Sequence, residues 1–350
     1  MTSSTSPTRA FAELDTAALG HNFSVVSALG GRTIAVVKAN AYGHGLSLAV
    51  DTLVRAGCDF FAVATIDEAL VVRAHAAHAD VLILGYTPPS LAPLLIRENI
   101  IQTVFGAPYA FALSAAAPTP VRAHLKIDCG MHRLGIAPDD TQMISHVLRA
   151  PRIEFCGVFT HLPCVGCDPK GTQSAISSFA SCIRGMPRLF THVAASAALP
   201  LTEARFDGAR PGLALYGLSD ALPSLRPAMR VFAPVIQVHA LPAGTPVGYD
   251  AAFFTTRPSC IGVLPIGYAD GIPRTASGYR VLCKDGSTAP IIGRVCMDQC
   301  MIDLTESHAK EGDTVCVIPD FASFAAHCGT IVYETLVGIS HRVERRRKGE

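Results

Sequence analysis

Residues 33–45 read TIAVVKANAYGHG, an apolar, β-branched run that ends at Lys38 and passes into a turn of small and polar residues. Such a run predicts a buried strand. Helical periodicity follows at once, because apolar residues recur at i, i+3 and i+4 from Leu46 to Ala56. A buried strand that leads through a short turn into an amphipathic helix is the repeating unit of parallel sheets.

The same unit recurs as far as Leu218, with further helices expected at Ile66–His78 and Thr172–Ile183. Eight such strands predict a closed (β/α)8 barrel of the TIM type, an α/β fold that we assign to residues 10–227. The expected strands are Thr33–Val37, Phe60–Ala64, Val81–Leu84, Ile101–Val104, Ala123–Ile127, Glu154–Thr160, Phe190–Ala194 and Gly212–Tyr216.

After Pro227 the pattern changes to short alternating runs separated by turn-forming clusters. We therefore expect a second, mostly β C-terminal domain over residues 228–350, with short helices at Phe321–His327 and Tyr333–Ile339. Its expected strands are Val231–His239, Cys260–Ile266, Arg280–Cys283, Pro290–Cys296 and Met301–Leu304.

Charge and hydrophobicity exclude several classes of partner. Among 350 residues, 29 Lys and Arg balance 28 Asp and Glu, which gives no reason to expect binding to nucleic acid or to an anionic membrane. The most apolar stretch, Val104–Val121, contains three prolines and does not predict a membrane span. A small molecule is the expected ligand.

Residues 1–9 are polar and lack the apolar core of a secretory signal. Without such a signal, the twelve cysteines predict reduced thiols, and the expected location is the cytoplasm. His161, Cys164 and Cys167 have a His-x2-Cys-x2-Cys spacing that suggests a metal site. Because zinc normally needs a fourth ligand, we expect no metal there and two reduced loop thiols.

Lys38 stands at the end of the first expected strand, and the active site of such a barrel is built where strands end. A partly desolvated lysine at this place suits a Schiff base with an aldehyde cofactor. On position alone, a solvated loop lysine is the simpler interpretation.

Five motifs, in order and spread over essentially the whole chain, resemble those of the alanine racemase family, which uses pyridoxal 5'-phosphate. They are Ala35–Gly45 (AVVKANAYGHG), Leu125–Gly135 (LKIDCGMHRLG), Arg210–Gly212 (RPG), Gly267–Gly271 (GYADG) and Gly293–Gln299 (GRVCMDQ). The motifs carry the resemblance, since a shared barrel by itself says little about function.

This resemblance implies interconversion of L-alanine and D-alanine through a pyridoxal-phosphate aldimine on Lys38, most often to supply D-alanine for peptidoglycan. Lys38 would act as the base on one face of the α-carbon, and Tyr268 as the base on the other. The resemblance also implies a homodimer with shared active sites, in which Tyr268 comes from the C-terminal domain of the partner subunit.

The resemblance assigns binding residues as well. Arg210 would face the pyridine nitrogen and, because a guanidinium keeps its proton, leave that nitrogen unprotonated. Arg133 and the backbone of Met297 from the second subunit would bind the substrate carboxylate. The other expected cofactor contacts are His161 against the ring, Tyr42, Ser196 and the amides of Gly212 and Leu213 around the phosphate, and His341 near the C-terminus.

Lys126 lies inside the fifth expected strand, where an unpaired ammonium facing the barrel would be costly. The resemblance implies that this lysine is carbamylated, which would give an anion that orients Arg133. An unmodified lysine paired with Asp128 or another carboxylate is the alternative.

Two positions near the expected pocket depart from the family pattern. Ala195 stands where Asn usually precedes the serine, and His341 stands where Tyr usually precedes Arg-Val. A serine racemase or a racemase of broader specificity is therefore an alternative. More distant alternatives are a decarboxylase of basic amino acids and a non-catalytic pyridoxal-phosphate-binding protein. Tyr268 and Arg210 argue against the decarboxylase, and the presence of a second domain argues against the non-catalytic binding protein.

Overall fold

The computed structural model describes residues 9–349, and contacts between residues divide the chain into two compact units. One unit comprises residues 17–41 and 46–226, and the other comprises residues 9–16, 42–45 and 227–349. The predicted absence of a secretory signal concerns residues 1–9, of which residues 1–8 lie outside the described range. No helix within residues 9–349 is long and apolar enough to span a membrane.

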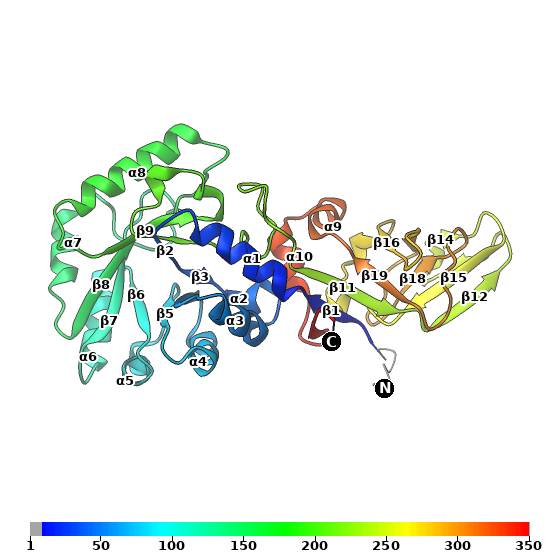
Figure 1. Ribbon diagram of the computed structural model, residues 1–350, viewed down its shortest axis with the longest axis horizontal. Helices are drawn as coiled ribbons and strands as arrows, with labels where there is room; N and C mark the ends of the chain where they lie inside the picture. The colour runs from blue at the N-terminus through cyan, green and yellow to red at the C-terminus, as the bar shows by residue number, and fades with distance from the viewer. Residues whose placement is uncertain (1–8, 350) are drawn as a thin grey trace. The chain divides into compact units, whose positions relative to one another are not determined.

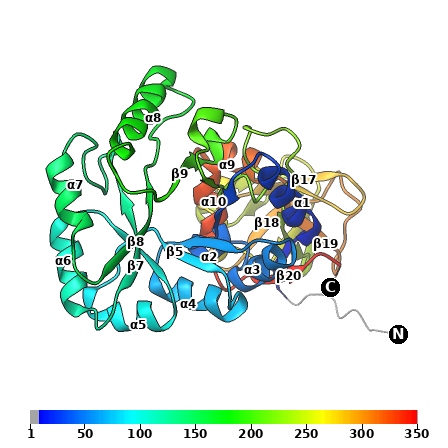
Figure 2. The same ribbon diagram turned by 60° about the vertical axis from the view of Figure 1, so that its left-hand side comes forward.

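The first unit is a barrel of parallel strands with helices around it (Figure 1, Figure 2). Ile34 divides its first strand into two halves, of which one pairs with β10 and the other with β4, so this strand joins both ends of the sheet. The strands are β2 (Arg32–Thr33), β3 (Ala35–Val36), β4 (Phe60–Val63), β5 (Asp80–Ile83), β6 (Ile101–Val104), β7 (Val121–Lys126), β8 (Ile153–Phe159), β9 (Phe190–Ala195) and β10 (Gly208–Arg210). The predicted barrel is confirmed.

Helices cover the outer face of this sheet because each presents an apolar side to it (Figure 2). Helix α3, for example, buries Leu46, Val50 and Leu53. The helices are α1 (Thr16–Ser27), α3 (Leu46–Arg55), α4 (Ile66–His75), α5 (Ala92–Arg97), α6 (Ala107–Ala116), α7 (Thr141–Leu148) and α8 (Pro169–Ile183), with a short α2 (Lys38–Tyr42) after the first strand.

The predicted position of the eighth strand is wrong. The strand is β10, whereas residues 212–216 form hydrogen-bonded turns in which the Leu215 N–H donates to the Gly212 carbonyl and the Tyr216 N–H to the Leu213 carbonyl. All five residues are buried. A short, fully buried apolar run looks the same in sequence whether it forms a strand or another buried element.

The second unit is mostly β, as predicted, and its main sheet has the order β12-β15-β18-β17-β16-β19-β11-β1-β20. Strand β1 (Phe11–Leu14) belongs to this sheet, although the predicted boundary placed it with the barrel. The other elements are β11 (Met229–Pro234), β12 (Gln237–Leu241), β15 (Ser259–Leu264), β16 (Arg280–Leu282), β17 (Thr288–Ile292), β18 (Cys300–Asp303), β19 (Thr314–Ile318), β20 (Glu344–Arg347), a hairpin of β13 (Pro246–Val247) and β14 (Phe253–Phe254), α9 (Phe321–Cys328) and α10 (Val332–Gly338).

Candidate active site

Lys38 begins a turn of unusual backbone conformation at the end of the first barrel strand. Residues 39–42 all have φ between 52° and 54°, in the left-handed region that residues other than glycine rarely adopt. The Ala41 N–H donates to the Val37 carbonyl over 2.9 Å within this turn. Strained backbone persists where the surrounding contacts fix one geometry, which is common at active sites.

Glu68 of α4 ties the Lys38 turn to the neighbouring strand. Its Oε1 accepts the Ala39 N–H at 2.6 Å, and its Oε2 accepts the Ala64 N–H at 2.9 Å. Burial lowers the pKa of Lys38, the charge of Arg133 lowers it further, and Glu68 raises it, with a net lowering. A lysine of lowered pKa holds more neutral amine, the form that attacks an aldehyde. Glu68 is not among the site residues predicted from the sequence, although a Thr-x-x-Glu spacing marks the start of this helix.

Arg210, the last residue of β10, is buried inside the barrel and held by four hydrogen bonds. It donates to the carbonyls of Thr160, His192 and Val193 at 2.6 to 3.0 Å, and to the His192 Nδ1 at 2.6 Å. Burial lowers the pKa of Arg210 to about 9, which leaves the guanidinium charged at neutral pH. The side chain is therefore a fixed cation.

Two buried histidines stand behind Arg210, and sequence analysis identified neither. The His192 Nε2 lies 2.9 Å from the His124 Nδ1. Burial holds the pKa of His192 well below its usual value and lowers the pKa of His124 to about 3, so both rings are neutral. Because the His192 Nδ1 accepts from Arg210, its Nε2 carries the proton and donates to His124. Both histidines lie inside predicted buried strands, and a titratable residue in a buried strand is the sequence feature that could have identified them.

Ser196 follows β9 and organises the segment after β10. Its buried Oγ accepts the N–H groups of Gly212 and Ala214, each at 3.0 Å. The structure therefore brings together Ser196 and Gly212, with the buried Leu213 between the two bonded amides. Since two amides already occupy the oxygen as acceptor, the hydroxyl proton of Ser196 is available to a ligand.

Positive charge concentrates among the predicted barrel residues. Burial lowers the pKa of His161 to about 3, and the charges of Arg210, Lys126, Arg133 and Lys38 lower it further, in that order of effect. His161 is therefore a neutral ring near four cationic side chains. Such a group of cations suits a phosphate or a carboxylate.

Lys126, the last residue of β7, is buried, and its Nζ donates to the Ile127 carbonyl over 2.8 Å. Burial, followed by the charge of Arg210, lowers its pKa to about 8. Asp128, the predicted alternative partner, accepts the backbone N–H groups of residues 130–132 through its Oδ1. Lys126 therefore holds an appreciable share of neutral amine near neutral pH.

The prediction of reduced loop thiols after His161 is wrong. Cys164 and Cys167 form a disulfide with a Cα–Cα distance of 5.6 Å, while the other ten cysteines are free. Reduced thiols were predicted because the expected location is the cytoplasm. The turn at residues 165–167, however, places the two Cα atoms within the distance that a disulfide spans. Within residues 9–349, no group of three or more His, Cys, Asp or Glu side chains is arranged to hold a metal ion.

In the second unit the structure brings Tyr268 and Met297 together. The Tyr268 N–H donates to the Cys296 carbonyl and the Ala269 N–H to the Met297 carbonyl, both over 3.0 Å. A Cβ at Gly267 would collide with the carbonyls of Cys296 and Met297, so only glycine permits this approach. Tyr268 and Met297 are 44% and 53% exposed, which leaves both open to a ligand.

Asp270 fixes the turn that carries Tyr268. Its buried carboxylate accepts the Gly267 N–H at 3.0 Å and lies 3.3 Å from the Arg342 guanidinium. The exposed His341 directly precedes Arg342 in the sequence. The ion pair between Arg342 and Asp270 therefore connects the segment that carries His341 to the turn that carries Tyr268.

Tyr42, grouped with the second unit, packs against Tyr333 of α10 with ring centroids 6.0 Å apart. Burial raises its pKa above the usual value, so the phenol keeps its proton and acts as a donor. Tyr333 is not among the site residues predicted from the sequence.

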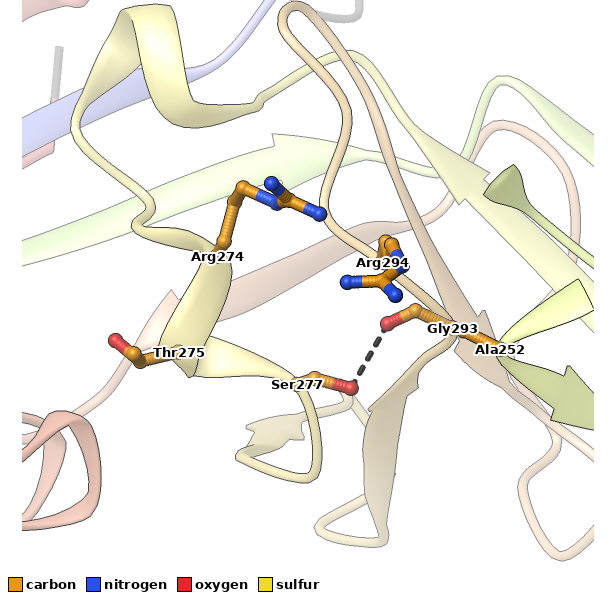
Figure 3. Close-up of a pocket in the computed structure, with 6 residues that line it drawn as sticks. All are labelled: Ala252, Arg274, Thr275, Ser277, Gly293 and Arg294. Atoms are coloured by element: carbon orange, nitrogen blue, oxygen red, sulfur yellow. Dashed lines mark hydrogen bonds between the residues drawn. The ribbon is translucent and has the colours of Figure 1, made fainter. Parts of the chain in front are cut away.

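A pocket of about 450 Å³ lies in the second unit, lined by Ala252, Arg274, Thr275, Ser277, Gly293 and Arg294 (Figure 3). The Ser277 Oγ donates to the Gly293 carbonyl over 2.8 Å across it. Arg294 is paired with Asp250 at 2.9 Å. None of the predicted site residues lines this pocket.

Comparison with known proteins identifies both parts of the chain. Residues 14–220 match the family described as alanine racemase, N-terminal domain, and residues 228–347 match alanine racemase, C-terminal domain. The alanine racemase of Desulfovibrio desulfuricans is 37% identical over 362 residues, covering 96% of this chain and 97% of that protein. The alanine racemase of Xylella fastidiosa strain 9a5c is 39% identical and covers 97% and 98%.

Solved structures agree with the sequence relatives. The alanine racemase from Bacillus anthracis with bound L-Ala-P is 30% identical with a TM-score of 0.89, covering 95% of this chain and 93% of its own. The enzyme from Bartonella henselae with covalently bound pyridoxal phosphate is 28% identical with a TM-score of 0.88, covering 97% and 100%. The chain thus belongs to the alanine racemase family.

Proposed function

We propose that this protein interconverts L-alanine and D-alanine with pyridoxal 5'-phosphate as its cofactor. The observation that carries the proposal is Lys38, a lysine of lowered pKa at the head of a strained turn where a barrel strand ends. Relatives named alanine racemase support the substrate, and a relative with covalently bound pyridoxal phosphate supports the cofactor.

The candidate cofactor-binding residues fit this cofactor. Bound at Lys38, it supplies an electron-withdrawing ring that stabilises negative charge at the substrate's α-carbon. The hydroxyl proton of Ser196, the amide of Leu213 and the phenol of Tyr42 are donors suited to its phosphate. The neutral ring of His161 suits the face of the cofactor ring.

Arg210 would set the course of the reaction by facing the pyridine nitrogen. Its four hydrogen bonds fix the guanidinium in place. Because the guanidinium keeps its proton at neutral pH, it would not protonate that nitrogen. Because Arg210 would not supply a proton to that nitrogen, the bound group would withdraw charge less strongly and the α-carbon would regain its proton quickly. This favours racemisation over transamination.

Two bases on opposite faces complete the proposal. Lys38 removes or returns the proton on one face of the α-carbon, and Tyr268 from the second subunit of a homodimer acts on the other. Arg133 and the backbone of Met297 hold the substrate carboxylate. The hydrogen bonds between the Tyr268 and Met297 segments support a common contribution of these two residues to one site.

Lys126 carries a modification in this proposal. Its pKa of about 8 provides neutral amine that adds carbon dioxide to form a carbamate, and the resulting anion attracts Arg133. High-resolution density at Lys126 from crystals grown with bicarbonate would show the added carboxylate. Density that ends in a plain amine would contradict the modification.

A chiral assay with added cofactor tests the main proposal against a panel of L-amino acids. We expect L-alanine to give both enantiomers in nearly equal amounts at equilibrium. Bound cofactor without turnover of any amino acid would favour a non-catalytic binding protein. Release of carbon dioxide from basic amino acids would favour a decarboxylase.

Serine is a second candidate substrate because of two residues. Ala195 ends β9 beside Ser196, and the exposed His341 offers a hydrogen bond to a side-chain hydroxyl. A pocket that merely tolerates an added hydroxyl discriminates by only about 10²-fold.

A further inference from the structure

The segment between His161 and α8 carries a feature that racemisation does not use. Cys164 and Cys167 form the only disulfide within residues 9–349, across the turn at residues 165–167 that precedes α8. Its ring encloses only the two residues between the cysteines. Because the stability gained from a disulfide grows with the length of the loop it closes, so short a loop gains little from it.

Other contacts already hold this segment in place. The Thr172 Oγ1 donates to the Cys164 carbonyl over 2.8 Å, and the Asp168 carboxylate caps α8 by accepting the Gly171 N–H at 2.9 Å. Leu162, in the same segment, is buried. A disulfide that adds little to the stability of the fold is a candidate for reversible oxidation and reduction.

The two sulfur atoms differ in environment. Cys167 is exposed, whereas Cys164 is half-buried and its Sγ accepts the Cys167 backbone N–H at 3.2 Å. This donated N–H stabilises a thiolate on Cys164. Cys167 is therefore the sulfur that an outside thiolate reaches, and Cys164 is the better leaving group.

We propose that Cys164 and Cys167 form a thiol–disulfide exchange site whose partner is a dithiol reductant. One thiolate of the reductant bonds to the Cys167 Sγ, and the Cys164–Cys167 bond breaks with its electron pair on the Cys164 Sγ. The second thiolate of the reductant then attacks its own mixed disulfide, which releases Cys167 as a thiolate. The protein gains two electrons and, once the thiolates are protonated, two protons, while the dithiol becomes a disulfide.

The reverse reaction uses the same asymmetry. The Cys167 thiolate attacks oxidised glutathione, breaks its S–S bond and releases one glutathione thiolate. The Cys164 thiolate then attacks the mixed disulfide on Cys167, releases the second glutathione thiolate and restores the Cys164–Cys167 bond. Cys167 makes the contact with the outside reagent in both directions, and Cys164 resolves the mixed disulfide.

Alkylation in graded glutathione buffers tests the site on the whole protein. Trypsin releases residues 153–170, which contain Cys156, Cys164 and Cys167. We expect this peptide to pass from one alkyl label in oxidising buffer to three in reducing buffer, with Cys164 and Cys167 changing together. Three labels in every buffer, or one label in every buffer, would overturn the proposal.

Single variants test the order of attack. With oxidised glutathione, Cys164→Ser should accumulate a mixed disulfide on Cys167 at a level roughly tenfold above that on Cys164 in Cys167→Ser. Equal or reversed levels would overturn the assigned roles. The matched control is Cys260→Ser, which removes an exposed free cysteine of β15 and should leave the exchange at residues 164 and 167 unchanged.

Discussion

Replacing Ser196 with Ala removes a single oxygen that satisfies two buried amides. The Gly212 and Ala214 N–H groups each donate to the Ser196 Oγ at 3.0 Å. A buried donor left without an acceptor costs about 1–3 kcal/mol, so the loss of both bonds should cost about 2–6 kcal/mol. The expected effect is a lower free energy of unfolding in protein freed of cofactor.

Urea denaturation of the wild-type and variant proteins measures this cost, with an unchanged slope as the sign that compactness is unaltered. Ser114→Ala is a matched control, because Ser114 is also buried in the barrel unit but bonds to a single carbonyl, that of Pro151. Its cost should be about half as large. If Ser196→Ala destabilises the protein no more than Ser114→Ala does, the inference that one oxygen serves two amides is refuted.

Three further predictions follow from the candidate site. Lys38→Ala should abolish the visible absorbance of bound cofactor and all racemisation. Glu68→Gln removes a charge that raises the pKa of Lys38, so it should shift the midpoint of cofactor uptake to lower pH. An unchanged or higher midpoint would contradict this. Tyr268→Phe should bind cofactor but lose turnover on the order of 10²-fold or more. Heterodimers of Tyr268→Phe with Lys38→Ala should recover about half the activity of a wild-type dimer, since one of their two sites is intact. No recovery in verified heterodimers would refute shared sites. L-serine should be turned over measurably alongside L-alanine in steady-state assays, and undetectable serine turnover would exclude a relaxed pocket.

Local pattern predicted most of the barrel because each strand and helix there carries its own periodicity. It failed for residues 212–216, whose apolar run is buried in a turn that Ser196 organises. It also failed for β1, because the pairing of Phe11–Leu14 with β11 and β20 is decided by residues far along the chain. Periodicity contains no information about such distant partners.

The candidate site shows the same division. The Lys38 motif was visible because its residues are contiguous in sequence. The chain of Arg210, His192 and His124 was not, because it depends on which barrel strands lie side by side and on which way each ring points. Cys164 and Cys167 were visible as a pair, but their bonding depended on the conformation of the turn between them.

The place of β1 in the second sheet has a consequence for biosynthesis. β1 leaves the ribosome well before both strands that pair with it, which begin at Met229 and Glu344. Since domains generally fold as they are made, the barrel can form while β1 remains an unpaired strand, exposed to wrong partners until residues 229–232 and 344–347 have been made. An N-terminal deletion that removes Phe11–Leu14 would detach β20 from its sheet, so such a deletion should cost yield of folded protein even though it leaves every candidate site residue in place.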